Sequence, residues 1–143
     1  MSITDKNNLI EIYKRNRFKI PYKDRLISFS ISNLESSDIY TLPFAIITAE
    51  NPMNKKCPDE INSQYNKKLE EEIYKLKYDY KKCVGEEGNH SENSFIIYNI
   101  EKDAAINLGT KFKQYCIFYN DGNELSYIEC ETRTTILKAK VII

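Results

Sequence analysis

The sequence predicts an α+β fold in a single domain that spans residues 1–143. Three observations lead to this prediction. Apolar residues recur at helical spacing over residues 58–76 and 101–113. Short apolar runs around these segments have the length and composition of strands. From residue 44 the order is strand, helix, strand, strand, helix, strand, strand, and its first six members match the split β-α-β order of ferredoxin-like folds. That order places the helices on one face of the sheet, and an N-terminal helix and an extra C-terminal hairpin are added to it.

The first part of the chain, residues 1–43, is predicted to be an N-terminal helix and an extension. Apolar residues over 7–17 have the spacing of a short amphipathic helix, and its basic end suits the negative pole of a helix C-terminus. Pro21 ends any helix there. Residues 26–31 alternate in the manner of an edge strand, and the polar residues 33–38 are expected to form a loop.

The βαββαββ core, residues 44–143, is predicted to open with a strand at 44–50 and a helix over 58–76. The apolar stripe of that helix consists of Ile61, Tyr65, Leu69, Ile73 and Leu76. Asn62 falls within the stripe and Asn66 at its border. If these amides are buried they must find hydrogen-bond partners. The alternative is that both reach water.

The second half of the core continues with strands and one more helix. Asn99 is a predicted N-cap for a helix over 101–113. The polar segment 85–91 has the composition of a turn, and Asn-Asp-Gly-Asn at 120–123 indicates a tight hairpin. The predicted strands of this half are 80–84, 94–98, 115–119, 125–131 and 134–143.

The charge balance argues against two classes of partner. Lys and Arg together number 21, as do Asp and Glu, so the formal net charge is zero. General binding to nucleic acid or to membrane surfaces depends on clustered basic charge, so we expect neither. The N-terminus lacks the apolar run of a signal peptide, and no apolar stretch approaches the roughly 18–20 residues of a membrane span. We therefore expect a cytoplasmic protein.

The four cysteines are expected to be reduced, because cytoplasmic proteins rarely hold disulfides. Cys116 and Cys130 lie in strand-like runs and are predicted to be small apolar residues of the core or an edge. A zinc site built from Cys57, Cys83 and His90 is the alternative for the other two, but their spacing matches no established zinc pattern. No metal site is predicted, and His90 is expected to be exposed in a polar turn.

The segment around Asn51 is the strongest local candidate for a functional site. An apolar β-run at residues 44–47 turns abruptly polar and ends in Asn51-Pro52, just before the helix predicted at 58–76. Backbone N–H groups are free where a strand meets a polar turn ahead of a helix. This corner is therefore a common kind of place for a ligand.

Several short motifs then occur at a characteristic spacing. Ile-Thr-Ala-Glu-Asn-Pro occupies residues 47–52, Asn66 precedes a helix leucine by three positions, Glu-Asn-Ser-Phe occupies 92–95, and Lys-Phe-Lys-Gln at 111–114 precedes an apolar strand. Together with the helix around Tyr13, these motifs resemble a bacterial family known as domain-of-unknown-function family 3293. The similarity extends over most of the chain.

Members of that family usually show Thr-Ala-x-Asn-Pro, an Asn before the helix leucines, Glu-x-Ser-Phe and a Phe-Gly-Gln-like ending. The chain departs from this pattern at Asn93, where proline is common, and at Lys113, where glycine is typical. The resemblance implies a bacterial, stand-alone domain and carries no established activity. The matching residues are Thr48, Ala49, Asn51, Pro52, Asn66, Glu92, Ser94, Phe95 and Gln114.

The polar side chains of these motifs, together with the proline of the Asn-Pro corner, form the candidate ligand site. The residues are Thr48, Asn51, Pro52, Asn66, Glu92, Ser94 and Gln114. Amides and hydroxyls orient a small polar ligand well, and Glu92 or Glu86 could serve as a general base. The alternative is architectural, because such residues often satisfy backbone groups. No nucleotide-binding or nucleophile motif is present, so no cofactor is assigned and enzyme activity stays undecided.

Two other functions are compatible with the same element order. RNA-recognition domains share it, but residues 94–100 lack their basic-glycine-aromatic pattern, and the neutral charge also argues against RNA. A protein-interaction module would use the edge formed by residues 125–143 for strand addition or for a homodimer. The apolar residues 141–143 would be costly to expose, so they are predicted to lie in the core or an interface.

Overall fold

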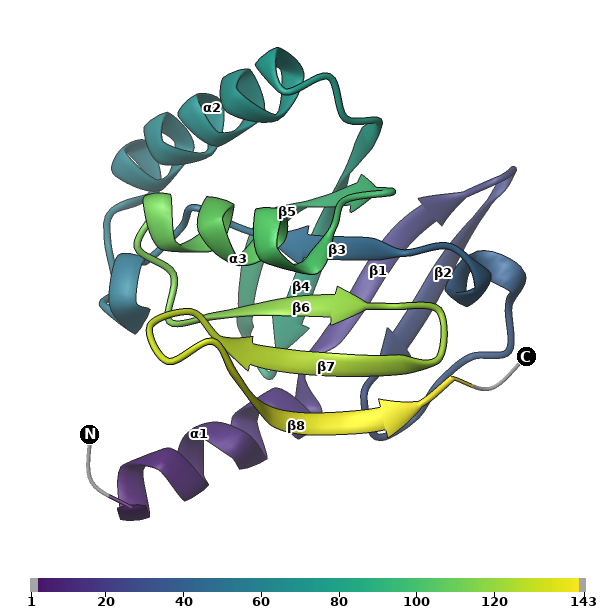
Figure 1. Cartoon of the computed structure of the whole chain (residues 1–143). Coiled ribbons are helices and arrows are strands. Elements are labelled where there is room, and N and C mark those ends of the chain that lie inside the picture. Colours follow the sequence, from purple (N-terminus) through teal and green to yellow (C-terminus); the bar gives the residue numbers. More distant parts are fainter. Residues whose placement is uncertain (1–2, 142–143) are drawn as a thin grey trace.

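The computed structural model describes residues 3–141 of the chain (Figure 1). Three α-helices, eight strands and two short 3-10 helices lie within these residues. In chain order they are α1 (Ile3–Arg15), β1 (Arg17–Tyr22), β2 (Arg25–Ser30), η1 (Asp38–Thr41), β3 (Phe44–Ile47), η2 (Pro52–Asn54), α2 (Asp59–Lys75), β4 (Tyr80–Glu87), β5 (His90–Tyr98), α3 (Lys102–Lys111), β6 (Cys116–Asn120), β7 (Glu124–Glu129) and β8 (Thr134–Lys140).

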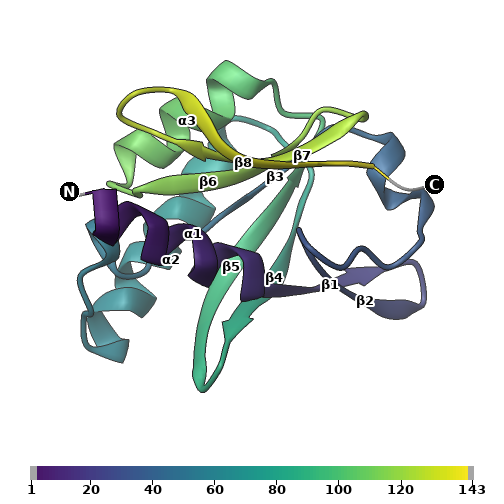
Figure 2. The same ribbon diagram turned by 90° about the horizontal axis from the view of Figure 1, so that it is seen from below.

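The strands form one antiparallel sheet in the order β2-β1-β4-β5-β3-β6-β7-β8. Strand β3 is central, because it pairs with β5 on one side and β6 on the other. The sheet is curled, with β7 and β8 at one side and β1 and β2 at the other (Figure 2). The prediction of an α+β fold is therefore confirmed. The ferredoxin-like split order is not confirmed, since four further strands extend and curl the sheet.

Two apolar cores lie on the two faces of the sheet. The first core lies beneath α2 and α3, where Leu69 and Ile73 of α2 pack with Ile106 of α3 over the β3 residues Ala45 and Ile47. Successive side chains of each strand point to opposite faces of the sheet, so each strand contributes apolar residues to both cores. The prediction that two helices share one face thus agrees with the positions of α2 and α3 (Figure 1).

The second core fills the inside of the curl and is rich in aromatic rings. Phe118 lies 4.8 Å from Phe18 and 5.1 Å from Tyr127, measured between ring centroids. Helix α1 lies on this opposite side of the sheet (Figure 1), where its Tyr13 stacks on Tyr127 at 4.5 Å. Each such ring pair adds about 1 kcal/mol to the burial of its area. The N-terminal helix is therefore attached to the sheet through an aromatic contact.

Helix α3 packs unusually closely on the sheet at Gly109. A Cβ atom added there would lie 2.5 Å from Cγ2 of Ile117 and 2.9 Å from Sγ of Cys130. Both distances are shorter than side chains tolerate, so only glycine fits without a shift of β6 or of the residue that follows β7. The close approach fixes the depth at which α3 and the turn that follows it lie on the first core.

The N-terminal third differs from the prediction in the bounds of its helix, in one strand and in the short helix η1. The helix predicted over 7–17 is present as α1, which begins at Ile3 and ends at Arg15, and β2 is an edge strand as predicted. Strand β1 was not predicted. It tolerates Pro21 because its pairing with β4 covers only Arg17 to Lys19, so no β4 partner needs the missing N–H.

The β4–β5 hairpin is longer than expected. The polar segment 85–91 was predicted to be a turn, but the ladder continues through the pairs Glu86–Ser91 and Glu87–His90. The turn is confined to Gly88 and its neighbour, with Gly88 at φ +57°. Polar residues on a solvent-facing hairpin carry no apolar alternation, which explains why the sequence pattern missed this extension.

The two ends of α3 differ in how far they follow the prediction. The predicted N-cap Asn99 is wrong: Glu101 occupies that position, while Asn99 has φ 56° and donates its backbone N–H to Pro43 at 2.8 Å. At the other end Lys113 has φ 57°. The N–H of Lys113 bonds Thr110, and that of Gln114 bonds Gly109, which is the Schellman arrangement that glycine favours.

The C-terminal strand β8 forms one edge of the sheet and pairs only with β7. Its residues are exposed or half-buried, and Val141 donates a hydrogen bond of 2.9 Å to Asn123. Ile142 and Ile143, which were predicted to lie in a core or interface, fall outside the described residues. In the part of the chain that the structure describes, no helix has both the length and the apolar character needed to cross a membrane.

Candidate functional site

Asn51 lies in the connection between β3 and α2, directly before η2. Its backbone is left-handed at φ 48°, and Pro52 begins η2 directly after it. The Asn51 backbone N–H donates to Oδ1 of Asn62 at 2.8 Å, and its own Oδ1 accepts from Nδ2 of Asn62 at 3.0 Å and from the N–H of Cys57 at 2.9 Å. The corner is thus held by two reciprocal amide contacts.

Asn66 holds the same corner from the next turn of α2. Its Oδ1 accepts from the N–H of Ala49 at 2.8 Å, and its Nδ2 donates to Oε2 of Glu50 at 3.2 Å and to the carbonyl of Asn93 at 2.9 Å. Asn62 and Asn66 are both buried. Of the two alternatives predicted for these asparagines, burial with hydrogen-bond partners is the one observed.

Glu50 is the site residue that the sequence reasoning did not select. Its side chain is buried, with 9% of the residue exposed, and its Oε2 also accepts from the N–H of Asn93 at 2.9 Å. No residue of the described chain donates a hydrogen bond to its second oxygen, Oε1. The sequence did carry a signal for Glu50, because this residue lies inside the Thr-Ala-x-Asn-Pro motif, shortly after a strand whose residues are all buried.

The surroundings of Glu50 raise the pKa of its carboxyl group. Burial is the largest cause, because desolvation disfavours the charged form, while the N–H of Asn93 acts in the opposite direction. The negative charges of Glu92 and Asp59 add to the increase, and His90 reduces it. Perturbed carboxyl groups that line a cleft are candidates for functional groups.

Glu92 lies on the other side of the corner. Its Oε2 accepts from Nδ2 of Asn51 at 2.9 Å and lies 3.7 Å from Nε2 of His90, which is exposed as predicted. Ser94 is buried, and its hydroxyl makes one long contact of 3.5 Å with the carbonyl of Glu92. Glu86, the other predicted base, forms an ion pair of 3.0 Å with Lys19.

Thr48 and Gln114 complete the arrangement. The hydroxyl of Thr48 donates to the carbonyl of Asn93 at 2.7 Å and accepts from the N–H of Glu50 at 3.1 Å. Nε2 of Gln114 donates to the carbonyl of Glu50 at 3.1 Å. The end of α3 is therefore attached to the corner, so that residues far apart in the sequence form one hydrogen-bonded network.

Two hollows adjoin this network. The corner hollow, of about 260 Å³, lies between α1 and the corner and is lined by Thr48, Asn51, Glu92, Ser94 and Gln114 among others. The α2 groove, of about 1000 Å³, lies between α2 and strands β4 and β5 and is lined by Glu50, Asn66 and again Ser94. Five of the seven predicted site residues thus share the corner hollow, Asn66 faces the other side, and Pro52 lines neither.

Within residues 3–141, no group of three or more His, Cys, Asp and Glu side chains is placed to hold a metal ion. All four cysteines are free. Burial raises the pKa of Cys83 and Cys116 to about 12 and that of Cys130 to about 11, so these thiols stay protonated at neutral pH.

The fold and the corner together define a class: an α+β protein whose curled antiparallel sheet carries a buried network of amides and a carboxylate beside two hollows. The sequence model of the family described as "Protein of unknown function (DUF3293)" matches residues 47–117. The matched segment runs from the corner to the start of β6. The chain therefore resembles this family, as its motifs predicted. No curated protein and no solved structure matches the chain.

Proposed function

We propose that the chain binds a small polar ligand in the corner hollow, with Glu92, Ser94 and Gln114 as the polar contacts. The observation that carries this proposal is the convergence of five predicted residues from separate segments on one hollow. Ligand sites are typically concave, largely apolar and equipped with a few fixed polar groups. The corner hollow has this composition.

Each proposed contact has unused hydrogen-bonding capacity. Ser94 makes only its 3.5 Å contact, near the limit for a hydrogen bond. Gln114 donates through Nε2, and no described residue donates to its Oε1. Glu92 is held at one oxygen by Asn51 and is partly exposed. These groups would accept hydrogen bonds from a ligand that carries several donors.

The far wall of the corner hollow is apolar. It includes Tyr13 of α1 together with Phe18, Phe118 and Tyr127 of the sheet. A ligand that fits would have an apolar body against these rings and a polar end at Glu92.

A thermal-shift screen of metabolites tests this proposal. Glu92→Gln keeps an oxygen for Asn51 and removes the charge, and Ser94→Ala removes one hydroxyl. Glu86→Gln is the matched control, because Glu86 lines the α2 groove and not the corner hollow. We expect compounds that raise the Tm of the wild type and of Glu86→Gln, with a smaller increase in the two site variants. A screen without any such compound, or equal shifts in all four proteins, contradicts the proposal.

The second candidate function is protein interaction through β8. This strand is an edge of the sheet, and strand addition to an edge is a common mode of recognition. Lys138 and Lys140 lie on it and oppose unspecific pairing. Sedimentation of the wild type over a hundredfold range of concentration tests for a homodimer. A monomer at every concentration argues against self-association through this edge. RNA binding is less favoured than either function, because the aromatic rings of the curl are buried.

We also propose that residues 1–143 form one domain, which works in the cytoplasm of a bacterium. In this proposal the neighbouring strands β4-β5-β3-β6 are the split β-α-β centre of that domain. Limited proteolysis tests the single domain. One protected fragment supports it, and cleavage into two stable pieces contradicts it.

A further inference from the structure

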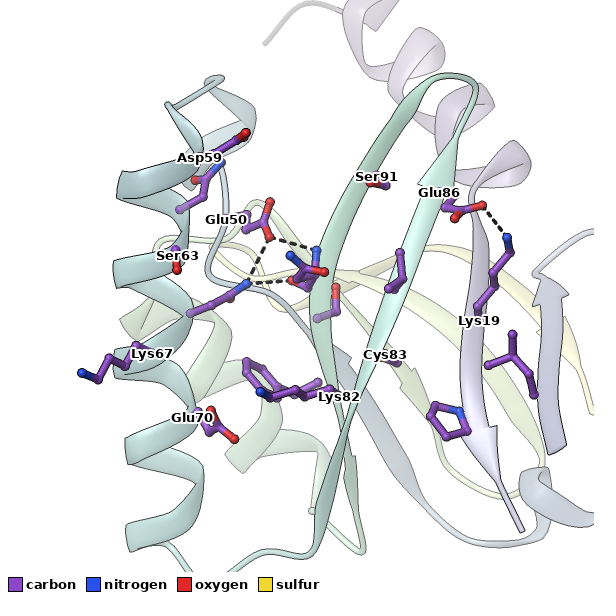
Figure 3. A pocket seen from close by; sticks show the side chains of 18 residues that line it. Lys19, Glu50, Asp59, Ser63, Lys67, Glu70, Lys82, Cys83, Glu86 and Ser91 are labelled. Carbon is purple, nitrogen blue, oxygen red and sulfur yellow. Dashed lines mark hydrogen bonds and ion pairs between the residues drawn. The ribbon is translucent and has the colours of Figure 1, made fainter. Parts of the chain in front are cut away.

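The α2 groove is larger than the corner hollow and is not needed for the function proposed above. Figure 3 shows Glu50 at one end of it, between α2 and the β4–β5 hairpin, with Asp59 near it on α2. Oε2 of Glu50 is occupied by Asn66 and Asn93. Oε1 has no hydrogen-bond donor among the described residues, and it is accessible to solvent although nine-tenths of the residue is buried.

We propose that the α2 groove is a second binding site, which takes a small molecule with a primary amine and places its ammonium group at Oε1 of Glu50. A compact ammonium has three N–H donors and no acceptor. It would satisfy the unused carboxylate oxygen with a charge-assisted hydrogen bond. Ser63 of α2 and Ser91 of β5 line the same groove from two sides and offer hydroxyl acceptors for the remaining donors.

The distribution of charge favours a cation over an anion at this end. Asp59 lines the groove and contributes negative potential at Glu50. The other two acidic residues of the groove are already engaged, since Glu86 pairs with Lys19 at 3.0 Å and Glu70 accepts from the hydroxyl of Tyr80 at 2.8 Å. Lys67 and Lys82 also line the groove, but they lie near Glu70 (Figure 3), whereas Glu50 and Asp59 have no ion pair among the described residues.

An architectural role does not require a charged residue at position 50. Both observed donors, Nδ2 of Asn66 and the N–H of Asn93, contact the same oxygen. A glutamine could accept both through its amide oxygen without the desolvation cost of a buried charge. The network therefore does not need a negative charge at position 50. A bound cation would offset the desolvation cost of that charge.

Nuclear magnetic resonance titration with butylamine tests the proposal. The side-chain amide of Asn66 and the backbone amide of Asn93 report on Glu50 directly. 1-Butanol and butanoate serve as neutral and anionic probes of the same length. We expect saturable shifts of both amides with butylamine alone. Equal shifts with 1-butanol would mean that the groove recognises only the apolar chain and would overturn the proposal.

The variant Glu50→Gln isolates the charge, because it can keep both hydrogen bonds. We expect it to weaken butylamine binding at least about tenfold, since it replaces a charge-assisted hydrogen bond by a neutral one. Glu71→Gln, on the exposed side of α2, is the control for net charge and should bind as the wild type does. Equal affinity in Glu50→Gln, or no saturable shift in the wild type, refutes the site. Glu92→Gln removes a negative charge near Glu50 but no residue that lines the groove, so it should weaken butylamine binding less than Glu50→Gln does, which separates this result from that of the corner hollow.

Discussion

Asn66 accepts a hydrogen bond of 2.8 Å from the backbone N–H of Ala49, so a side chain of α2 takes the place of a strand partner just after β3 ends. The same amide satisfies the carbonyl of Asn93 in the neighbouring strand. One asparagine thus connects a helix to two strands at the point where the chain leaves the sheet. Such a buried amide specifies the geometry of the corner more narrowly than an apolar side chain would.

Replacement of Asn66 by alanine should therefore be costly. Asn66→Ala leaves the N–H of Ala49 and the carbonyl of Asn93 without these partners, and we expect the free energy of unfolding to fall by about 2–3 kcal/mol. Urea denaturation measures the change. Gln64→Ala, at an exposed position of the same helix, is the control and should change stability by less than about 0.5 kcal/mol. A loss no larger than that of the control would show that water replaces the amide freely.

Glu50 should make stability depend on pH in an identifiable direction. Its pKa is raised in the folded protein above the ordinary value of 4.5. The folded state therefore binds a proton more readily than the unfolded state. The contribution of Glu50 to stability is complete below the unfolded pKa and is lost as the pH rises through the folded pKa.

The glutamine of the variant Glu50→Gln cannot ionise, so the variant does not lose this contribution to stability as the pH rises. We expect its stability relative to the wild type to increase from about pH 4.5 upward and to level off above the folded pKa. Urea denaturation of both proteins between pH 4 and pH 8 measures the difference. The lowered pKa of Glu129 acts in both proteins and cancels. A stability difference that stays constant or decreases as the pH rises contradicts this prediction.

Gly109 should resist substitution although it lies within a helix. Gly109→Ala gains about 1 kcal/mol of helix propensity, but its Cβ would lie 2.5 Å from Ile117. We expect a net loss of about 1–3 kcal/mol, because either α3 or β6 must move. Thermal unfolding monitored by circular dichroism measures it. Asn107→Ala, at an exposed position of α3, gains helix propensity without a packing clash and loses only an exposed hydrogen bond from Arg133, so it is the control for packing.

Lys113 offers the opposite case. It adopts φ 57° at the position after α3 where the resembled family typically has glycine. Lys113→Gly should raise the free energy of unfolding by about 1 kcal/mol, because glycine takes this conformation without strain. Lys113→Ala retains a Cβ and should give little change. Equal effects of the two variants would mean that loss of the lysine side chain, rather than relief of the backbone, causes the gain.

The long periodic and tightly patterned segments of the fold were predictable. The stripe that includes Leu69 and Ile73 defined α2, and Asp121-Gly122 located the β6–β7 hairpin. Strand β1 was missed because it is short, contains Pro21 and follows a helix with one intervening residue. The extension of the β4–β5 hairpin was missed because its polar residues face solvent, where pairing rather than composition decides the structure.

The members of the hydrogen-bonded network were more predictable than its contacts, and the ligand site itself stays a prediction. The motifs identified Asn51, Asn66 and Gln114, which the structure joins in one network. Glu50 was not selected, because nothing in a sequence indicates that a carboxylate after a buried strand turns inward. The hydrogen bonds of Asn93 could not be predicted from the sequence either, because its backbone N–H and carbonyl form them and its side chain does not.

The position of β3 at the centre of the sheet has a consequence for biosynthesis. All four of its residues are buried, and both strands that pair with it, β5 and β6, come later in the chain. During translation this apolar tetrapeptide emerges well before either neighbour exists. The sheet can close only after the ribosome has released β6, so contacts distant in sequence govern its assembly and favour folding on the millisecond-to-second scale. Until then the nascent segment presents an unprotected surface of the kind that chaperones bind.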